Sequence, residues 1–127
     1  MAKLSQESKK IIGEGCTAFI ATASKKGQPN VSPKGSFRVL DNEHVGFMEM
    51  ALPPARTCSN LKENPQVSVM FFNQTTGKGC RIWGKAVEIA ESGKLVEDFK
   101  AWLASKGAAD VVPKYVVKIA VEEEIVL

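Results

Sequence analysis

An arginine and a threonine that follow two prolines form the pattern in this sequence most able to do chemistry. The segment 50–63 reads MALPPARTCSNLKE. Proline is favoured in the first turn of a helix, so the pattern predicts a helix over 54–63. Arg56 and Thr57 then lie in its first turn, where backbone N–H groups have no partner inside the helix and the helix dipole is positive.

Such a helix start can hold a phosphate group. An arginine guanidinium forks two charge-assisted hydrogen bonds onto phosphate oxygens, and the Thr57 hydroxyl can add a third. Lys34, which precedes a glycine, could bring another positive charge from a neighbouring strand. Arg-Thr is a weak motif, however, and the alternative is that Arg56 is a solvated surface residue on a short helix. The residues alone leave both interpretations open.

The remaining reactive residues indicate neither a catalytic group nor a metal site. The chain has one histidine, His44, which excludes a site of several histidines, and it contains no glycine-rich nucleotide loop. The cysteines Cys16, Cys58 and Cys80 include no C-x-x-C pair, so we expect reduced, buried thiols. The glutamates at 122–124 form a charge run that is typical of a solvated strand edge.

Length and composition describe an ordinary globular chain. Its 127 residues suit one domain, 1–127, with 44% apolar and 24% charged residues. The net charge of +3 comes with scattered lysines, which argues against a nucleic-acid partner. Because the sequence has no leader peptide and no run of 18 apolar residues, we expect a cytoplasmic protein without membrane contact.

Hydrophobic periodicity predicts a mainly β fold with helices (α+β). The expected helices are 4–15 with Ser5 as its cap, 54–63, and one that Ser92 caps and that ends near 106. The expected strands are 17–24, 30–41 as two short strands or one broken strand, 44–50, 66–73, 80–90 and 114–127. Short connections favour antiparallel neighbours, so we predict an antiparallel barrel with packed helices.

Two of these strands carry further detail. In 66–73 both alternating sets of side chains can be buried, which is typical of a central strand. Gly84 can provide the sharp bend that a small barrel needs. Alternation over 80–90 predicts Ile82, Gly84 and Ala86 on one face and Arg81, Trp83, Lys85, Val87 and Ile89 on the other.

Taken in order, several short motifs resemble one known family. The runs are ATASKKGQPNVSP, GFMEMALPPARTCSNLKENPQVSVMFF and GCRIWGKAVEI. They resemble the pyridoxamine 5′-phosphate oxidase-like family of FMN-binding split β-barrels, in which a strand leads into a helix that begins with Arg or Lys and Ser or Thr. The resemblance covers nearly the whole chain, and it implies a homodimer with two FMN molecules at the subunit interface.

The resemblance also implies roles for particular residues. Arg56 and Thr57 would bind the FMN phosphate. The second strand would contact the flavin or its phosphate through Val31, Ser32, Pro33 and Lys34. The strand before the helix would line the isoalloxazine ring and the ribityl chain, largely through backbone groups, with Phe47, Met48, Glu49 and Met50. The long strand would reach the partner's flavin with Arg81 and Trp83, and the apolar residues 125–127 could cover that flavin.

Departures from the family pattern narrow the expected activity. Members that oxidise pyridoxamine phosphate have an arginine where Ser32 stands here, and a C-terminal segment with Arg and Trp where this chain reads EEEIVL. The chain resembles the short FMN-binding members instead. We therefore expect an FMN-dependent oxidoreductase or electron-transfer protein, with a small-molecule or protein redox partner that the sequence does not identify. A split barrel that binds F420 or haem, and a non-catalytic flavin-storage or flavin-binding module, are the alternatives.

Overall fold

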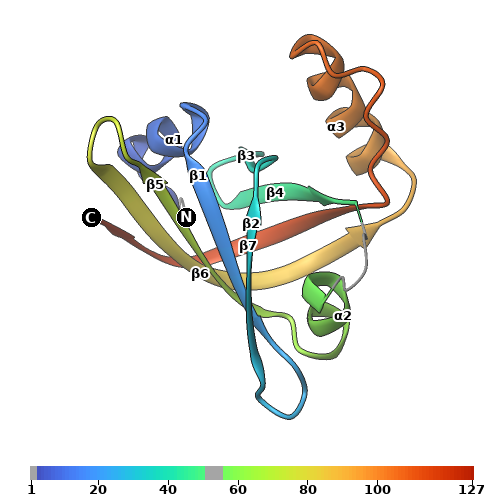
Figure 1. Ribbon diagram of the computed structural model, residues 1–127, viewed down its shortest axis with the longest axis horizontal. Helices are drawn as coiled ribbons and strands as arrows, with labels where there is room; N and C mark the ends of the chain where they lie inside the picture. The colour runs from blue at the N-terminus through green and yellow to red at the C-terminus, as the bar shows by residue number, and fades with distance from the viewer. Residues whose placement is uncertain (1–2, 51–55) are drawn as a thin grey trace.

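The computed structural model describes residues 3–50 and 56–127, which form one curled sheet with three helices (Figure 1). The helices are α1 (Gln6–Gly13), α2 (Arg56–Glu63) and α3 (Lys94–Ser105). The strands are β1 (Thr17–Ala23), β2 (Pro29–Lys34), β3 (Arg38–Val39), β4 (His44–Glu49), β5 (Gln66–Asn73), β6 (Lys78–Ala90) and β7 (Tyr115–Val126).

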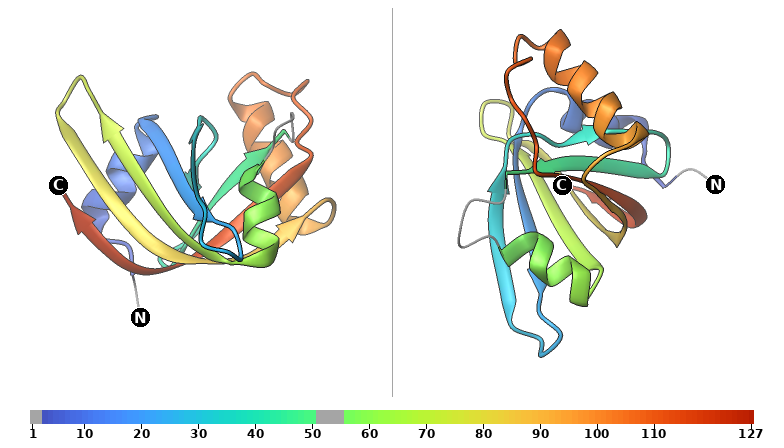
Figure 2. Two further views of the ribbon diagram at one scale, coloured as in Figure 1. Left: turned by 60° about the horizontal axis from the view of Figure 1, so that its bottom comes forward. Right: turned by 90° about the vertical axis from the view of Figure 1, so that its right-hand side faces the viewer.

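The sheet is antiparallel throughout its described pairings. Its strand order is β2-β1-β5-β6-β7-β4-β3, so β5 is a central strand, as predicted. Figure 2 shows the sheet bent into a trough, which is an incompletely closed barrel. The predicted mainly β fold with packed helices is therefore confirmed. For 30–41 the sequence predicted either two short strands or one broken strand. Residues 35–37 separate β2 from β3, so the segment forms two short strands.

Aromatic and aliphatic side chains fill the trough. The ring centroid of Phe37 lies 5.0 Å from that of Phe47 and 5.1 Å from that of Phe71. Helix α1 packs on the same core through Ile11 and Ile12, which are 2% and 3% exposed. Contact between these elements buries the apolar surface that stabilises the curl of the sheet.

Helix α1 begins where the sequence predicted. The Ser5 hydroxyl accepts a hydrogen bond from the backbone N–H of Ser8 at 3.1 Å, which satisfies one of the unpaired donors of the first turn. The helix ends at Gly13, and Gly15 follows with a φ of +74°. The predicted cap of α3 is wrong. Gly93, not Ser92, holds the capping position and contributes no side-chain hydrogen bond.

Helix α2 is attached to the β1–β2 hairpin by polar side chains. Three residues that recur every third position, and therefore share one side of the helix, make these contacts. They are Thr57 with the Ser32 hydroxyl at 3.2 Å, Asn60 with the Thr22 hydroxyl at 3.1 Å, and Glu63 with the backbone N–H of Lys25 at 3.1 Å. This attachment sets where the start of α2 lies relative to β2.

Strand β6 bends where it crosses from β5 to β7. Its register against β7 shifts at Trp83/Gly84 and again at Ala86/Glu88. A Cβ on Gly84 would lie 2.1 Å from the carbonyl oxygen of Ala120, so only glycine fits there. The strict alternation predicted for 80–90 is wrong at Ile89, which packs on the same core as Ala86, because a bulge changes the face to which the following residues point.

Candidate functional site

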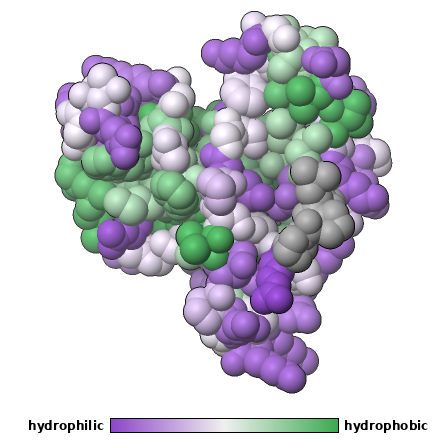
Figure 3. Space-filling model, in the orientation of Figure 1, coloured by the Kyte–Doolittle hydropathy of each residue, from purple (hydrophilic) through white to green (hydrophobic). Residues whose placement is uncertain are grey.

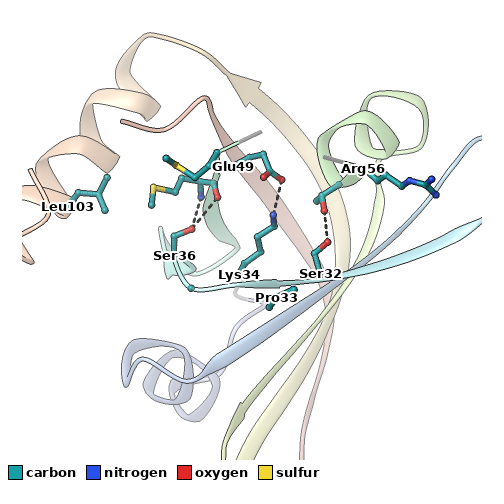
Figure 4. Close-up of a pocket in the computed structure, with 11 residues that line it drawn as sticks. Ser32, Pro33, Lys34, Ser36, Glu49, Arg56 and Leu103 are labelled. Carbon is teal, nitrogen blue, oxygen red and sulfur yellow. Dashed lines mark hydrogen bonds and ion pairs between the residues drawn. The ribbon is translucent and has the colours of Figure 1, made fainter. Parts of the chain in front are cut away.

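A cavity of about 600 Å³ lies between β2, the end of β4, α2 and α3 (Figure 4). We call it the site cavity. It is lined by Ser32, Pro33, Lys34, Gly35, Ser36, Met48, Glu49, Met50, Arg56, Thr57 and Leu103. Strands β2 and β4 stand near opposite ends of the sheet order, and the curl of the sheet brings them together here. The volume is in the range of cofactor and small-molecule sites.

Two hydroxyl groups and a guanidinium lie where α2 meets β2. The Thr57 side chain is buried, and its Oγ1 lies 3.2 Å from Ser32 Oγ. Arg56 is exposed, and its side chain points away from Lys34 in Figure 4. A hydroxyl can donate one hydrogen bond and accept two, so the pair keeps capacity for a further oxygen atom. This end of the cavity has the groups that bind an anionic oxygen.

A buried ion pair lies in the same cavity. Lys34 Nζ is 2.8 Å from Glu49 Oε2, and the two side chains are 14% and 8% exposed. The Lys34 ammonium also lies 5.8 Å from the centroid of the Phe47 ring. Because an unpaired charge is costly at such burial, each ion stabilises the charge of the other. With Arg56, the lining has two cations and one carboxylate.

The Ser36 hydroxyl forms hydrogen bonds with the backbone of β4 beside the cavity. Ser36 Oγ accepts a hydrogen bond from the Met48 N–H at 2.9 Å and donates one to the Met48 carbonyl at 3.3 Å. The backbone of Met48, which the family resemblance implied as a flavin contact, therefore already has partners. Its side chain is the part of Met48 that is available to a ligand.

Eight of the twelve residues implied by the family resemblance line the site cavity, and Val31, Phe47, Arg81 and Trp83 do not. The Phe47 side chain is 0% exposed within the core, so only its backbone could contact a ligand. Val31 is exposed on the other side of β2 from Ser32. Arg81 and Trp83 lie on β6, where Trp83 lines a separate cavity of about 280 Å³. The structure therefore groups the α2, β2 and β4 residues and leaves the β6 residues apart.

Sequence reasoning missed three lining residues, Gly35, Ser36 and Leu103. Gly35 and Ser36 directly follow Lys34, and this adjacency is the signal that could have identified them. Leu103 lies on α3, where the sequence shows it as one member of an apolar stripe. No signal in the sequence separates it from the other members, because the packing angle of the helix decides which of them reaches the cavity.

Cys58 lies beside the site as a protonated thiol. Burial, with a smaller contribution from the charge of Glu49, raises the pKa of Cys58 from 9.0 to about 11. Burial also raises the pKa of Cys80 to about 11. All three cysteines are free, and Cys58 and Cys80 are buried as predicted, whereas Cys16 is only partly buried.

The histidine lies outside the site cavity. His44 Nδ1 is 2.8 Å from Asp41 Oδ1, at the turn that precedes β4. Across residues 3–50 and 56–127, no group of three His, Cys, Asp or Glu side chains is placed to hold a metal ion. Within the same ranges, every helix is too short or too polar to cross a membrane.

An apolar face continues from the cavity onto the outer side of the sheet. Pro33, a lining residue, pairs with Phe19, which pairs in turn with Met70. Figure 3 shows apolar side chains gathered over β1 and β5. The outer face, as we call it, comprises the rows Pro33, Phe19, Met70, Arg81, Ile125 and Val31, Ala21, Ser68, Trp83, Glu123. Phe19 and Ile125 on it are 42% and 45% exposed.

Two other proteins share more than 30% of their aligned residues with this chain. Over 73 residues it is 37% identical to an uncharacterised protein of Methanocaldococcus jannaschii. That match covers 58% of this chain and 48% of the relative, so the chain spans about half the length of this curated relative. HupZ of Group A Streptococcus has a crystal structure that is 33% identical, with a TM-score of 0.82, over 98% of this chain and 94% of HupZ.

Proteins named for different cofactors share the fold. An FMN-binding protein of Syntrophomonas wolfei is 12% identical with a TM-score of 0.82, over 96% of this chain and 84% of that protein. HutZ, the haem storage protein of Vibrio cholerae, is 24% identical with a TM-score of 0.75, over 98% and 94%. A protein named F420 reductase is 15% identical with a TM-score of 0.69. At these identities the likeness establishes the fold and not the cofactor.

A family comparison covers almost the entire sequence. Residues 4–126 match the sequence model of the family described as pyridoxamine 5′-phosphate oxidase. The curled antiparallel sheet agrees with the split-barrel fold that the motifs implied. The chain therefore belongs to the pyridoxamine 5′-phosphate oxidase family.

Proposed function

We propose that this protein is a flavoprotein that binds FMN in the site cavity and works as an oxidoreductase or electron-transfer protein. The observation that carries the proposal is the Ser32–Thr57 hydroxyl pair, which lies beside Arg56 at one end of a cavity of about 600 Å³. Membership of the family supports the choice of FMN, and an FMN-binding protein shares the fold.

The FMN phosphate would be held where α2 meets β2. One hydroxyl of the Ser32–Thr57 pair donates to the other, and the second hydroxyl would donate to a phosphate oxygen. The first turn of α2 adds backbone N–H groups and its dipole. The Arg56 side chain is exposed, so a change of rotamer toward the cavity costs little. Its fork of donors then matches two phosphate oxygens.

The rest of the cavity suits an aromatic ring. Pro33, Met48 and Leu103 supply apolar surface, and the Lys34 ammonium favours negative charge on a bound ring. FMN, when bound, supplies the hydride-transfer or electron-transfer chemistry. The residues of this chain bind the cofactor, orient it and adjust its electrostatic surroundings, with a redox partner that is a small molecule or a protein.

The proposal includes a homodimer. The outer face exposes Phe19, Val31 and Ile125, and Pro33 connects that face to the site cavity. A second copy of the chain would bury these side chains and bring its own residues to the edge of the cavity. Arg81 and Trp83 lie on this face, as a contact with the partner's flavin requires.

Titration of the purified protein with FMN and with riboflavin tests the proposal. Flavin fluorescence should report saturable FMN binding, and riboflavin should bind more weakly because it lacks the phosphate. Arg56→Ala should lower FMN affinity by about 1.5–3 kcal/mol, the usual contribution of a charge-assisted hydrogen bond, and should leave riboflavin affinity unchanged. Equal affinity of the wild type for the two flavins would contradict the phosphate assignment.

The absorption spectrum of the protein as purified separates the alternatives. The spectrum of oxidised flavin supports FMN, whereas that of haem or of F420 would replace it. The position of His44 argues against a histidine-ligated haem in the site cavity, because this single histidine contacts Asp41 and does not line the cavity. Bleaching of bound flavin by NADH or NADPH would separate an oxidoreductase from a flavin-storage module.

A further inference from the structure

A second cavity, of about 550 Å³, lies between α3 and the β3, β4 and β7 end of the sheet. Its lining shares no residue with that of the site cavity. The lining includes two cations, two carboxylates and an aromatic ring, which belong to Arg38, Lys118, Asp41, Asp98 and Trp102. The volume of this second cavity is in the range of small-molecule sites, and the proposed function makes no use of it.

The two cations of the second cavity flank a glycine on neighbouring strands. Arg38 of β3 pairs with Gly46 of β4, and Gly46 pairs in turn with Lys118 of β7. Residues directly opposite one another share a face of the sheet, and two strand spacings separate the backbones of the cations by about 10 Å. Both side chains are long, so they can approach one anion from either side. A Cβ on Gly46 would lie 3.1 Å from Leu40 and from Phe99, so the glycine leaves the space that these two side chains occupy.

Arg38 is held in place by aromatic rings and keeps free hydrogen-bond donors. Its Cζ lies 5.5 Å from the centroid of the Phe99 ring and 5.3 Å from that of the Trp102 ring. Its Nη1 donates a long hydrogen bond, of 3.4 Å, to the backbone carbonyl of Asp98. A guanidinium carries five N–H donors, so most of them remain for a ligand. Because the rings already orient the guanidinium, a ligand loses little of its binding free energy to ordering this side chain.

Lys118 brings a charge without a counter-ion. Its side chain is partly buried, and its ammonium forms no hydrogen bond or ion pair with any residue of 3–50 or 56–127. Glu88 of β6 stands opposite Lys118 in the strand pairing, but no ion pair joins the two side chains. The Lys118 ammonium is therefore available to an anion that enters the second cavity.

The two carboxylates of the lining already have cationic or hydrogen-bonding partners. Asp41 Oδ1 lies 2.8 Å from His44 Nδ1, and Asp98 Oδ2 lies 3.0 Å from Lys94 Nζ. These contacts leave the two cations to a ligand, but they keep negative charge at the edge of the cavity. Since like charges repel, a ligand with one negative charge is favoured over one with several.

We propose that the second cavity binds a small aromatic acid in its carboxylate form. The Arg38 guanidinium would fork two hydrogen bonds onto the carboxylate, and the Lys118 ammonium would balance its charge. The ring of the ligand would pack on apolar side chains of the lining that are only partly buried, which are Leu40, Leu95 and Trp102. This inference goes beyond the proposed function and does not depend on it.

Titration of the ¹⁵N-labelled protein with phenylacetate, followed by NMR at the indole N–H of Trp102, tests the proposal. The Trp102 signal should shift and saturate, and phenylacetate should bind about tenfold or more tightly than phenylacetamide, its neutral amide. Trp83 provides an internal reference, because it lies on β6 beside a different cavity and its signal should stay in place. Saturating FMN should leave the affinity for phenylacetate unchanged, since the two cavities share no lining residue.

A pair of lysine variants tests the charge that Lys118 supplies. Lys118→Gln should lower the affinity for phenylacetate by about fivefold to tenfold, because it removes one charge-assisted contact, and should leave the affinity for phenylacetamide unchanged. Lys85→Gln, which removes an exposed lysine of β6, is the matched control and should bind phenylacetate as the wild type does.

The possible outcomes separate this inference from the proposed function. Equal affinities for the acid and the amide would overturn it, and so would a Trp102 signal that does not saturate. Displacement of phenylacetate by FMN would also overturn it, because the acid would then occupy the site cavity. A protein that binds phenylacetate at Trp102 but fails to bind FMN contradicts the proposed function alone. Should Lys118→Gln not fold, the comparison of acid with amide on the wild type still decides the question.

Discussion

The Thr57 side chain serves both the fold and the candidate site. It is 2% exposed, bonds Ser32 across to β2, and lines the site cavity. Thr22 of β1 makes a similar contact with Asn60, which follows Thr57 by about one turn of α2. Thr22 does not line the cavity. The two threonines therefore allow structural and ligand-binding contributions to be separated.

We expect Thr57→Val and Thr22→Val each to lower the free energy of unfolding by about 1 kcal/mol. Thr57→Val removes a hydrogen bond from the partly buried Ser32 hydroxyl, and Thr22→Val removes one from the buried Asn60 amide. Only Thr57→Val should also weaken FMN binding, by fivefold to tenfold. Urea denaturation measures the first effect and flavin fluorescence the second. If Thr22→Val weakens FMN as much as Thr57→Val does, the Thr57 hydroxyl is not a ligand of the phosphate.

The buried thiols predict a loss of stability at alkaline pH. Cys58 has a pKa of about 11 in the folded protein, against 9.0 as its ordinary value, so the folded state binds the proton more tightly. The stability that this raised pKa contributes is fully present below pH 9 and is lost as the pH rises toward 11. The free energy of unfolding should fall by up to about 1.4 kcal/mol per pH unit for this thiol.

Urea denaturation between pH 8 and 10.5 measures that slope. Lysines and tyrosine titrate in the same range, so the wild type must be compared with Cys58→Ala. At pH 8 the free energy of unfolding of Cys58→Ala should be lower than that of the wild type, because the smaller side chain leaves a cavity. Its free energy of unfolding should nevertheless fall less steeply as the pH rises. Parallel slopes in the two proteins would show that Cys58 ionises normally in the fold.

At the scale of elements, Gly84 decides how closely β6 and β7 pack. A methyl group there would lie 2.1 Å from a backbone oxygen of Ala120, and a backbone oxygen moves only if the strand moves. The strand must also bend at this point, as its register shift indicates. Because there is no space for a Cβ between β6 and β7 at this point, their close approach requires glycine.

Gly84→Ala should lower the free energy of unfolding by about 1–3 kcal/mol, the usual range for overpacking, and thermal or urea denaturation measures it. Gly13→Ala is the control, because no atom lies within 4 Å of its added Cβ and alanine is the better helix former. It should be neutral or stabilising by up to about 1 kcal/mol. A Gly84→Ala protein as stable as the wild type would mean that β6 and β7 separate readily.

For the whole molecule, the outer face makes a prediction about assembly. Phe19→Lys places a charge at its centre, and Val112→Lys places the same charge on an exposed valine in the loop before β7. Light scattering should give about twice the chain mass for the wild type and for Val112→Lys, and the single-chain mass for Phe19→Lys. The Phe19→Lys monomer should also lose FMN affinity, if the cavity needs residues from a second copy.

Local signals in the sequence predicted the elements well. Alternating apolar residues identified the strands, the Ser5 cap identified the start of α1, and the order of short motifs identified the family. These signals succeed because they depend on chemistry within a few residues of one another. Two predictions from the sequence were wrong. The cap of α3 is Gly93 and not Ser92. The face of Ile89 differs because a bulge in the pairing of β6 with β7 changes the alternation.

The sequence by itself determined the types of residue that could bind a phosphate, Arg56 and Thr57 with Lys34, and the fold class that would hold them. Only the tertiary structure decided that Ser32 lies against Thr57, that Glu49 neutralises Lys34, and that Leu103 of α3 completes the cavity. The physical reason is the curl of the sheet, because pairing across many strands brings β2 and β4 together over a distance that no local pattern encodes.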